Sequence, residues 1–351
     1  MAFPDKPRVN LEDLQERILA SEDPRGFLRR YPEGAIFDEI QNVPDLLSQI
    51  QVEIDSRPAE GRFILTGSNQ GSLRAGIGQT LAGRTAIAEL FPFTISELDG
   101  PYSPLDVDKL IQTGFYPRIW DKNLDAAEAL SFYVATYVER DLRSVQAIQD
   151  LGRFQKFLAL CAGRTGQLLN VASLAGDAGI SPNTARDWIS ILEAGFIVFQ
   201  LRPWHENMGK RLVKMSKLYF WDVGLASWLL GNSTPAHVAT HPLRGSLFEN
   251  LIIADTLKRE RHRAGKRSFF FYRDSHGNEA DLAIVDGPLV DLVEIKAGET
   301  VHPELWKHLP HIRSAMGRAG GDYVVHGGTG DWETMGVHVR GWREWMLRKD
   351  D

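Results

Sequence analysis

The sequence predicts an α/β protein in three parts, and three patterns support this prediction. Near the N-terminus, short apolar runs alternate with a helical pattern, as in a parallel sheet with crossover helices. The middle of the chain shows mostly helical spacing of its apolar residues. Toward the C-terminus, an amphipathic helix is followed by three strand-like runs, a helix and a further strand. We expect the three parts to cover residues 1–98, 99–205 and 206–351.

The composition is that of an ordinary globular chain. Of 351 residues, 43% are apolar and 25% are charged, which argues against a disordered or fibrous protein. The net charge of −6 gives no nucleic-acid footprint over the whole chain, so any such surface must be local. Two basic runs exist, at 202–217 and 258–267. Either run can also be a solvated helix face or loop.

Cellular location follows from cysteine usage and apolar runs. The single cysteine, Cys161, excludes an internal disulfide and a multi-cysteine metal site, which fits a reducing compartment. No apolar run approaches the roughly 20 residues of a membrane span, and the N-terminus lacks the apolar core of a secretory signal. We therefore expect a cytoplasmic protein that does not bind membranes.

The first part reads as strands separated by helices. The three strand-like runs are RVNLEDL, EGAIFDEIQ and GRFILTGSNQ. The segment VPDLLSQIQVEID between the last two runs has helical spacing, so the unit is a parallel crossover. Such a unit brings the C-terminal ends of its strands to one sheet edge, where ligands bind. The polar residues expected at that edge are Asp38, Glu39, Ser68 and Asn69.

These residue types suit nucleotide hydrolysis. Asp38 can hold Mg²⁺, and Glu39 can orient the water that attacks a terminal phosphate. Ser68 or Asn69 can sense that phosphate from the neighbouring strand. Arg84, in a later segment, can neutralise charge in the transition state. A structural alternative is that the Asp-Glu pair only caps the next helix.

Several segments together resemble prokaryotic AAA-superfamily ATP-binding proteins that carry a C-terminal restriction-endonuclease-like domain. The matching segments are IFDEIQNVPDLL, FILTGSNQ, LAGR, LFPFTISEL, GFYPRIW, YVERDLR, LYFWDVGLASWLLG and GSLFENLI. The resemblance implies that Asp38 and Glu39 are the Walker B pair, that Ser68 and Asn69 form the sensor region, and that Arg84 is an arginine finger. It also implies ATP as a cofactor and a homo-oligomer, because AAA proteins often assemble.

The sequence departs from this family in its phosphate loop. The pattern GxxxxGK[ST] is absent, and the Gly-Lys pairs at 208–211 and 264–268 lack the upstream glycine and the following Ser or Thr. Either the chain is a truncated version of a longer protein, or it is a domain that no longer cradles phosphates. Without the loop, we expect it to bind ATP weakly or not at all.

The middle part contains a predicted winged helix-turn-helix. A short helix, the turn AGIS, a helix that opens at Ser181 and an apolar strand pair follow one another over 167–204. In such units the second helix can enter the major groove of DNA, which makes Asn183, Thr184 and Arg186 candidate base contacts. Alternatively, the unit packs on the ATPase part or on another subunit.

The last part has the element order of the PD-(D/E)XK nucleases. A helix that contains Glu249 precedes three strands, a helix and a strand. Asp281 lies on the second strand, while Glu294 and Lys296 lie on the third. Residues two apart on a strand share a face, so Glu294 and Lys296 point to the same place, with Asp281 alongside. The pattern therefore predicts one site containing all four residues.

Magnesium-dependent cleavage of nucleic acid is the chemistry that these residues suggest. Asp281 and Glu294 can hold Mg²⁺ together with the carbonyl of Ile295, and Lys296 can position or deprotonate water or offset phosphate charge. Glu249 can add a ligand. The neighbouring residues Asp274, His276 and Glu279 are expected to be turn and rim residues.

The partner that this chemistry requires is nucleic acid, expected to be DNA. The basic run at 258–267, with Arg259, Arg261 and Arg263, is expected to lead a phosphate backbone to the site. Two alternatives remain: a surface hairpin whose Glu and Lys form an ion pair of little consequence, and a nuclease fold that has lost its activity. In the second case the chain is a non-catalytic, DNA-associated or regulatory protein.

Overall fold

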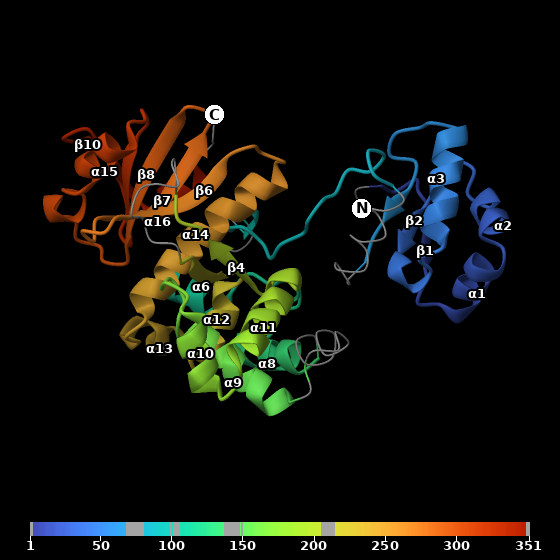
Figure 1. Cartoon of the computed structure of the whole chain (residues 1–351), viewed down its shortest axis with the longest axis horizontal. Coiled ribbons are helices and arrows are strands. Elements are labelled where there is room, and N and C mark those ends of the chain that lie inside the picture. Colours follow the sequence, from blue (N-terminus) through green and yellow to red (C-terminus); the bar gives the residue numbers. More distant parts are fainter. Residues whose placement is uncertain are drawn as a thin grey trace. The chain divides into compact units, whose positions relative to one another are not determined.

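The computed structural model describes residues 3–67, 81–98, 100, 106–136, 148, 150–204 and 215–348. The chain divides into two compact units, Met1–Ala88 and Glu89–Asp351. Each unit has its own apolar core. Figure 1 shows the helices and strands of both units, coloured along the sequence.

The first unit contains a parallel three-stranded sheet in the order β1-β2-β3. Its strands are β1 (Arg8–Asn10), β2 (Ile36–Asp38) and β3 (Ile64–Leu65). Its helical segments are α1 (Leu14–Glu22), α2 (Pro24–Arg29), the 3-10 turn η1 (Ile40–Asn42) and α3 (Leu46–Ser56). The predicted crossover of strand, helix and strand is therefore found as β2, α3 and β3, with both strand pairs parallel.

Local signals explain where the helices of the first unit begin. The Asp13 carboxylate accepts hydrogen bonds from the backbone N–H groups of Gln15 and Glu16, which caps α1. Asp23 caps α2 in the same way, directly before Pro24 in the first turn. The core of the unit then forms around Phe37 on the central strand, which is fully buried.

The second unit begins with short helices, which agrees with the predicted helical middle part. These are α5 (Ile95–Leu98), α6 (Val107–Thr113), α7 (Pro117–Asp121), α8 (Ala126–Tyr133) and α9 (Leu151–Ala162). Two more follow the strand pair described next: α12 (Val223–Leu229) and α13 (Pro235–Thr240). The predicted amphipathic helix over 133–148 falls largely outside the described residues.

A helix-turn-helix arrangement lies at the predicted place. Helix α10 (Val171–Ala178) ends at Gly179, which has a left-handed φ of 73°. Helix α11 (Pro182–Ala194) begins after Ser181, whose hydroxyl accepts a hydrogen bond from Thr184 N–H. The antiparallel strands β4 (Val198–Leu201) and β5 (Lys217–Phe220) follow.

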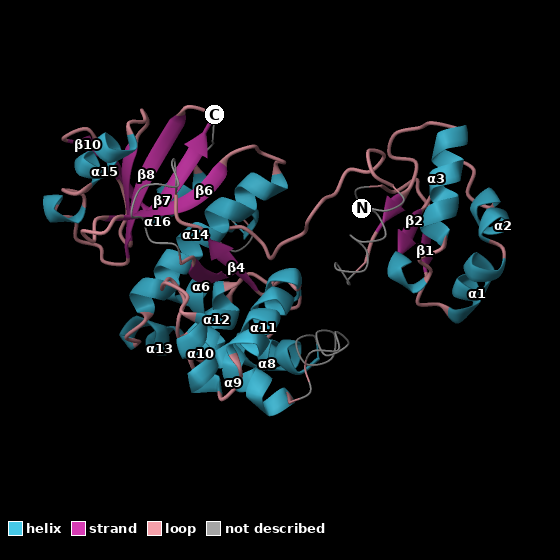
Figure 2. Cartoon of the chain, viewed as in Figure 1, coloured by secondary structure: helices cyan, strands magenta, loops and turns pink. Residues whose placement is uncertain are grey.

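The last part contains a mixed sheet of six strands in the order β10-β11-β9-β8-β7-β6. The strands are β6 (Ser268–Arg273), β7 (Glu279–Asp286), β8 (Leu289–Lys296), β9 (Asp322–His326), β10 (Asp331–Thr334) and β11 (Val337–Gly341). The helical segments are α14 (Arg244–His262), η3 (Pro303–Leu305), α15 (Leu309–Met316) and α16 (Trp342–Leu347). The predicted order of helix, three strands, helix and strand is found as α14, β6 to β8, α15 and β9. Figure 2 shows α14 and α15 as helices and β6, β7 and β8 as strands in this part.

Two apolar clusters cover the two faces of this sheet. Leu282 and Val293 pack in a cluster that contains Phe248 of α14. Leu292 packs in a separate cluster that contains Ile312 of α15. The strands that carry the predicted site are therefore buried on both sides, and only their ends can present polar side chains to a ligand.

The C-terminal part differs from the prediction in one helix. The sequence pattern predicts one helix over 302–319, but the structure has the turn η3 and the separate helix α15. Pro310 is in the first turn of α15, where its missing N–H costs nothing, whereas inside a longer helix it would break the backbone ladder. None of the described helices combines the length and the apolar character that crossing a membrane requires.

Candidate functional site

The four residues predicted in the C-terminal part converge at one end of the sheet. Glu249 comes from α14, Asp281 from β7, and Glu294 and Lys296 from β8. Lys296 Nζ lies 2.5 Å from Glu294 Oε1 and 3.9 Å from Asp281 Oδ2. Both carboxylates are therefore within 4 Å of one ammonium group. We call the group Glu249, Glu279, Asp281, Glu294, Lys296 and Lys217 the acidic site.

Lys217 is the member of the acidic site that the sequence pattern did not reveal. It begins β5, and its Nζ lies 2.6 Å from Glu279 Oε1, 3.1 Å from Glu249 Oε1 and 3.6 Å from Asp281 Oδ1. Only 4% of its side chain is exposed. A lysine this deep in the protein requires partners for its charge, and it has three carboxylates.

Hydrogen bonds fix the orientation of the carboxylates. The backbone N–H of Ile295 donates to Asp281 Oδ2 at 2.8 Å. The hydroxyl of Tyr219 donates to Glu249 Oε1 at 2.5 Å, and His308 Nε2 lies 3.2 Å from Glu294 Oε2. Sequence reasoning missed Tyr219 and His308, because each reaches the site from an element other than those carrying the motif.

Burial and crowding of negative charge shift the pKa values at the site. Burial, with the nearby charge of Asp281, raises the pKa of Glu249 to about 7. The same two causes raise the pKa of Glu294. Burial opposes the charge of Lys296, but Asp281 and Glu294 outweigh it and raise the pKa of that ammonium. Lys296 therefore carries its proton at neutral pH.

The turn residues near the site divide into two kinds. The Asp274 carboxylate accepts hydrogen bonds from His276 N–H and Asn278 N–H, as expected of a turn residue. Glu279 differs from the rim position expected for it, because its two oxygens contact Lys217 at 2.6 Å and Arg273 at 3.2 Å. It thereby belongs to the ion network of the acidic site.

The donor set of the acidic site suits Mg²⁺ in chemical type. Asp281 and Glu294 offer carboxylate oxygens, and Mg²⁺ usually takes one or two carboxylates and keeps several waters. Among the described residues, no group of three or more His, Cys, Asp or Glu side chains is arranged as a ready-made metal centre.

The residues predicted to handle nucleotide lie at the strand ends of the first unit. The Asp38 carboxylate, at the end of β2, accepts hydrogen bonds from the hydroxyl of Thr66 and from the guanidinium of Arg8. These two bonds hold the pKa of Asp38 below its usual value. Glu39 follows with a left-handed backbone, at φ 58° and ψ 46°.

The other residues predicted to contact nucleotide are Arg84, Ser68 and Asn69. The Arg84 guanidinium forms an ion pair with Asp55 of α3, with Nε 2.6 Å from Oδ1. Ser68 and Asn69 lie outside the described residues.

The predicted DNA contacts on α11 are at its N-terminal end. Asn183 and Arg186 are exposed, and Thr184 is half-buried against the cap at Ser181. Arg186 Nη1 donates to Asn183 Oδ1 at 2.7 Å. These side chains are thus presented to solvent on the helix that a helix-turn-helix uses for recognition.

The basic run at the end of α14 does not adjoin the acidic site. Arg261 is twelve residues from Glu249, which is about 18 Å along a helix. Arg259 is packed inside the protein, with its Nε 3.2 Å from Asp255 Oδ2, and Arg263 pairs with Glu260. Only Arg261 of these three has a mostly exposed side chain.

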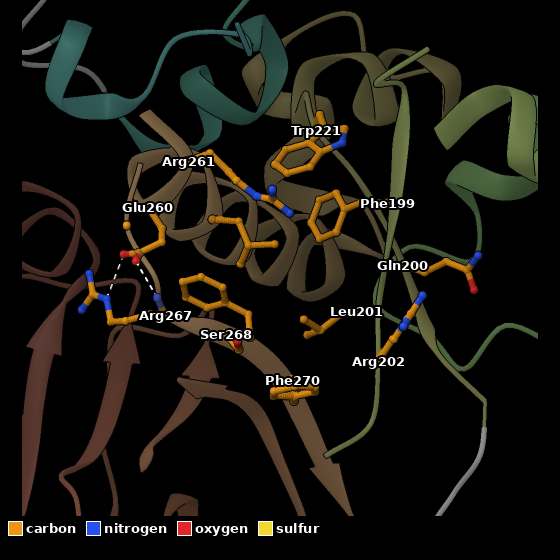
Figure 3. Close-up of a pocket in the computed structure, with 13 residues that line it drawn as sticks. Phe199, Gln200, Leu201, Arg202, Trp221, Glu260, Arg261, Arg267, Ser268 and Phe270 are labelled. Atoms are coloured by element: carbon orange, nitrogen blue, oxygen red, sulfur yellow. Dashed lines mark hydrogen bonds and ion pairs between the residues drawn. The ribbon is translucent and has the colours of Figure 1, made fainter. Parts of the chain in front are cut away.

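A cavity of about 380 Å³ lies beside the end of α14 (Figure 3). Arg261 lines it together with Arg202 and the aromatic rings of Phe199 and Trp221. Arg267 on its wall is held by Glu260, with Nε 2.8 Å from Oε2. Arg261 therefore lies at this cavity and not beside the acidic site.

Three family models match the chain. An AAA domain matches residues 5–99, a domain of unknown function (DUF8612) matches residues 105–236, and a second one (DUF4143) matches residues 244–343. Lys217 belongs to the middle region and the four carboxylates to the last one, so residues from both regions build the acidic site.

Two curated mycobacterial proteins are similar to the chain. They are the uncharacterized proteins Rv2008c of Mycobacterium tuberculosis and Mb2031c of Mycobacterium bovis. Each is 29% identical over 218 residues, which is 62% of this chain and 48% of the relative. The matched part thus spans about half the length of these relatives.

Among solved structures, protein VC1899 from Vibrio cholerae aligns with 94% of this chain and 77% of its own, at 13% identity and a TM-score of 0.22. By the family models, residues 5–99 are similar to an AAA domain and residues 244–343 to the DUF4143 domain.

Proposed function

We propose that this protein is a magnesium-dependent phosphodiesterase that cleaves nucleic acid at the acidic site. The observation that carries the proposal is that the carboxylates of Asp281 and Glu294 converge on the ammonium group of Lys296. Buried strands gain no stability by turning two carboxylates and a lysine toward one point, because each charge loses hydration there. Such an arrangement is typical of a site that handles a charged ligand.

Each residue has a distinct task in this proposal. Bound Mg²⁺ supplies an activated water and charge stabilisation for the transition state. The Ile295 N–H holds Asp281, and His308 holds Glu294, so both ligands are oriented beforehand. Lys296 keeps its proton and is half-exposed, so it can donate hydrogen bonds to a phosphate oxygen. Its role is then to offset phosphate charge, because an ammonium group cannot deprotonate water.

The partner in this proposal is nucleic acid, with DNA as the first candidate. The exposed start of α11, with Asn183, Thr184 and Arg186, provides one contact surface, and the cavity beside Arg261 provides another. Because residues 5–99 match an AAA domain, the proposal also includes control by ATP. In longer relatives, ATP with Mg²⁺ at Asp38 then controls the cleavage of nucleic acid. Assembly into a homo-oligomer belongs to the same proposal.

Cleavage of labelled single-stranded and double-stranded DNA and RNA tests the function. We expect cleavage with Mg²⁺ and none with a chelator. Asp281→Ala should abolish cleavage and also the metal-induced rise in melting temperature. Lys296→Ala should lower the cleavage rate by about 100-fold or more while keeping the metal-induced rise, since its ammonium is not a ligand.

Asp286→Ala is the matched control, because Asp286 is an exposed acid on the same strand, β7. This variant should cleave and bind metal like the wild type. If no substrate is cleaved by the wild type, or if Asp281→Ala cleaves at the wild-type rate, the nuclease proposal fails.

A second candidate function is nucleic-acid binding without cleavage. One observation favours it: Lys217, Lys296 and His308 already face the carboxylates of the acidic site, so the network is balanced without a metal ion. Fluorescence anisotropy with the same oligonucleotides distinguishes the two candidates. Binding that persists without any cleavage, and that weakens in Arg186→Ala, would favour this second function.

A further inference from the structure

The cavity beside the end of α14 has a surplus of positive charge. Its charged lining residues are the arginines Arg202, Arg261 and Arg267 and one carboxylate, Glu260. Glu260 is buried, and its oxygens accept hydrogen bonds from Arg267 N–H and Nε, both at 2.8 Å, and from Arg263 Nε at 3.0 Å. Two guanidinium groups therefore neutralise the one carboxylate, and the remaining charge favours an anionic ligand.

Arg261 is placed to meet such an anion. Its side chain is 63% exposed, and its Nη1 lies 3.8 Å from Glu89 Oε2, which is too long for a hydrogen bond. Figure 3 shows the guanidinium of Arg261 extending toward the rings of Trp221 and Phe199. A phosphate at the mouth of the cavity can therefore accept hydrogen bonds from Arg261 without breaking a buried ion pair.

The aromatic lining of the cavity offers one ring for stacking. Trp221 is already packed against Phe91 and Phe199, with ring centroids 4.2 and 4.4 Å away. Phe269 also lines the cavity and is only half-buried. Among the described residues, no other aromatic ring stacks on Phe269. A flat aromatic ligand can therefore stack there, and a nucleobase is such a ligand.

The wall of the cavity is a fixed part of the fold. Gly265, in the turn after α14, lines the cavity, and a Cβ at this position would lie 2.0 Å from Glu260 Oε1. The turn therefore follows the buried carboxylate closely. The volume of about 380 Å³ is within the range of small-molecule pockets, so the cavity has room for one base with its phosphate.

Strand β6 connects this cavity with the acidic site. Ser268, at the start of β6, lines the cavity, and Arg273, at its end, contacts Glu279 of the acidic site at 3.2 Å. The strand between these two residues spans about 17 Å. A nucleic-acid strand of a few nucleotides covers that distance, so one of its bases can occupy the cavity while its backbone reaches the acidic site.

We propose that this cavity binds one unpaired nucleotide of a single-stranded nucleic acid, with the base on Phe269 and the phosphate on Arg261. A base inside a duplex does not fit this role, because its faces are covered by the neighbouring base pairs. The inference rests on nucleic acid as the partner in the proposed function, and it narrows that partner to a strand with unpaired bases. The cavity is thus a binding site, whereas cleavage belongs to the acidic site.

Fluorescence anisotropy of the full chain, with a chelator present, tests the stacking contact. The probes are a labelled thymidine oligonucleotide, an abasic oligonucleotide of the same length, and a duplex. Phe269→Leu should weaken binding of the thymidine strand by about 10-fold and leave the other two probes unaffected. Phe269→Tyr keeps the ring and should bind like the wild type. Phe132→Leu, at a phenylalanine that is 62% exposed on α8, is the matched control.

Arg261→Ser tests the phosphate contact. This variant should weaken binding of the thymidine strand and the abasic strand alike, and it should make the slope of log affinity against log salt shallower by about 0.7. Arg118→Ser, at an exposed arginine of α7, is the matched control and should keep the wild-type slope. Melting temperatures of all variants identify any that fold poorly.

Three results would overturn the inference. The first is that Phe269→Leu binds the thymidine strand as tightly as the wild type, or weakens the abasic strand equally. The second is that Arg261→Ser leaves the salt slope unchanged. The third is that free thymidine monophosphate competes as well as the strand does, because the cavity would then take a free nucleotide.

The result is separable from the fate of the proposed function. If the wild type cleaves no nucleic acid but needs Phe269 to bind the thymidine strand, the nuclease proposal fails and the nucleotide-binding cavity stands. If the wild type cleaves with Mg²⁺ and Phe269→Leu binds and cleaves equally well, the reverse holds.

Discussion

Glu39 has a backbone conformation that L-residues rarely adopt. Its φ of 58° costs about 1–2 kcal/mol relative to glycine, which has no Cβ to clash with the carbonyl. Strain of this kind is concentrated at functional positions, and Glu39 directly follows Asp38 at the end of β2. We predict that Glu39→Gly stabilises the first unit by about 1 kcal/mol, measured by urea unfolding followed by circular dichroism.

Glu39→Ala is the control for this prediction. It removes the carboxylate and its contact with Gln41 but keeps the strained conformation. If the two variants are equally stable, release of backbone strain is not the cause of any gain.

At the same scale, local spacing predicted part of the acidic site. Glu294 and Lys296 are two residues apart on β8, so the pleat of the strand places both on one face. The antiparallel pairing of β7 with β8 then brings Asp281 beside them. Lys217 gave no comparable signal. It lies 32 residues before Glu249, and only the packing of β5 against α14 brings the two together. The one hint in the sequence was a lysine directly before the apolar run Leu218–Trp221.

Helix α14 shows how one basic run can divide into structural and exposed residues. The side chains of Arg259 and Asp255 are 10% and 1% exposed, respectively, and their ion pair lies one helical turn apart. Asp255 also accepts a hydrogen bond from Ile95 N–H. Arg261, on the next exposed position, has a side chain that is 63% exposed. Sequence alone could not separate them, because the helical phase of the run depends on which face meets the core.

This difference predicts opposite outcomes for two similar substitutions. Arg259→Ser should destabilise the second unit by about 3 kcal/mol, because it removes one of the two cations, Lys258 and Arg259, that act on the buried Asp255 carboxylate. Arg261→Ser should change stability by less than about 0.5 kcal/mol. Urea unfolding followed by tryptophan fluorescence measures both. Equal stability of the two variants would show that the buried ion pair contributes little.

Over the whole molecule, the order of helices and strands along the chain was easier to predict than which elements pack or pair with one another. The parallel first sheet and the order of helix and strands in the last part follow from apolar periodicity, which is set locally. The prediction did not include the strands β10 and β11, which extend the last sheet, or the helix α16 that follows them. β10 is exposed along most of its length and α16 has only six residues, so neither gave a clear pattern. β11 does alternate apolar and polar residues, but over only five residues.

The separate cores of the two units lead to a final prediction. Phe37 is the centre of the first core, with ring centroids 5.5 Å from Phe27, 5.7 Å from Tyr31 and 5.8 Å from Phe63. Phe248 is fully buried in a cluster made only of residues from the second unit. All 9 tryptophans of the chain also lie in the second unit, so their fluorescence reports on that unit alone.

Phe37→Ala should destabilise the first unit by about 3–5 kcal/mol through the cavity that it leaves. Urea unfolding should then show an early phase in circular dichroism, while the tryptophan transition stays at its wild-type midpoint. Phe248→Ala should do the opposite and move the tryptophan transition to lower urea. If Phe37→Ala shifts the tryptophan midpoint as much as it shifts circular dichroism, the two units unfold as one. The separate cores would then not correspond to separate folding units, and a substitution in the AAA domain would be felt at the acidic site through stability alone.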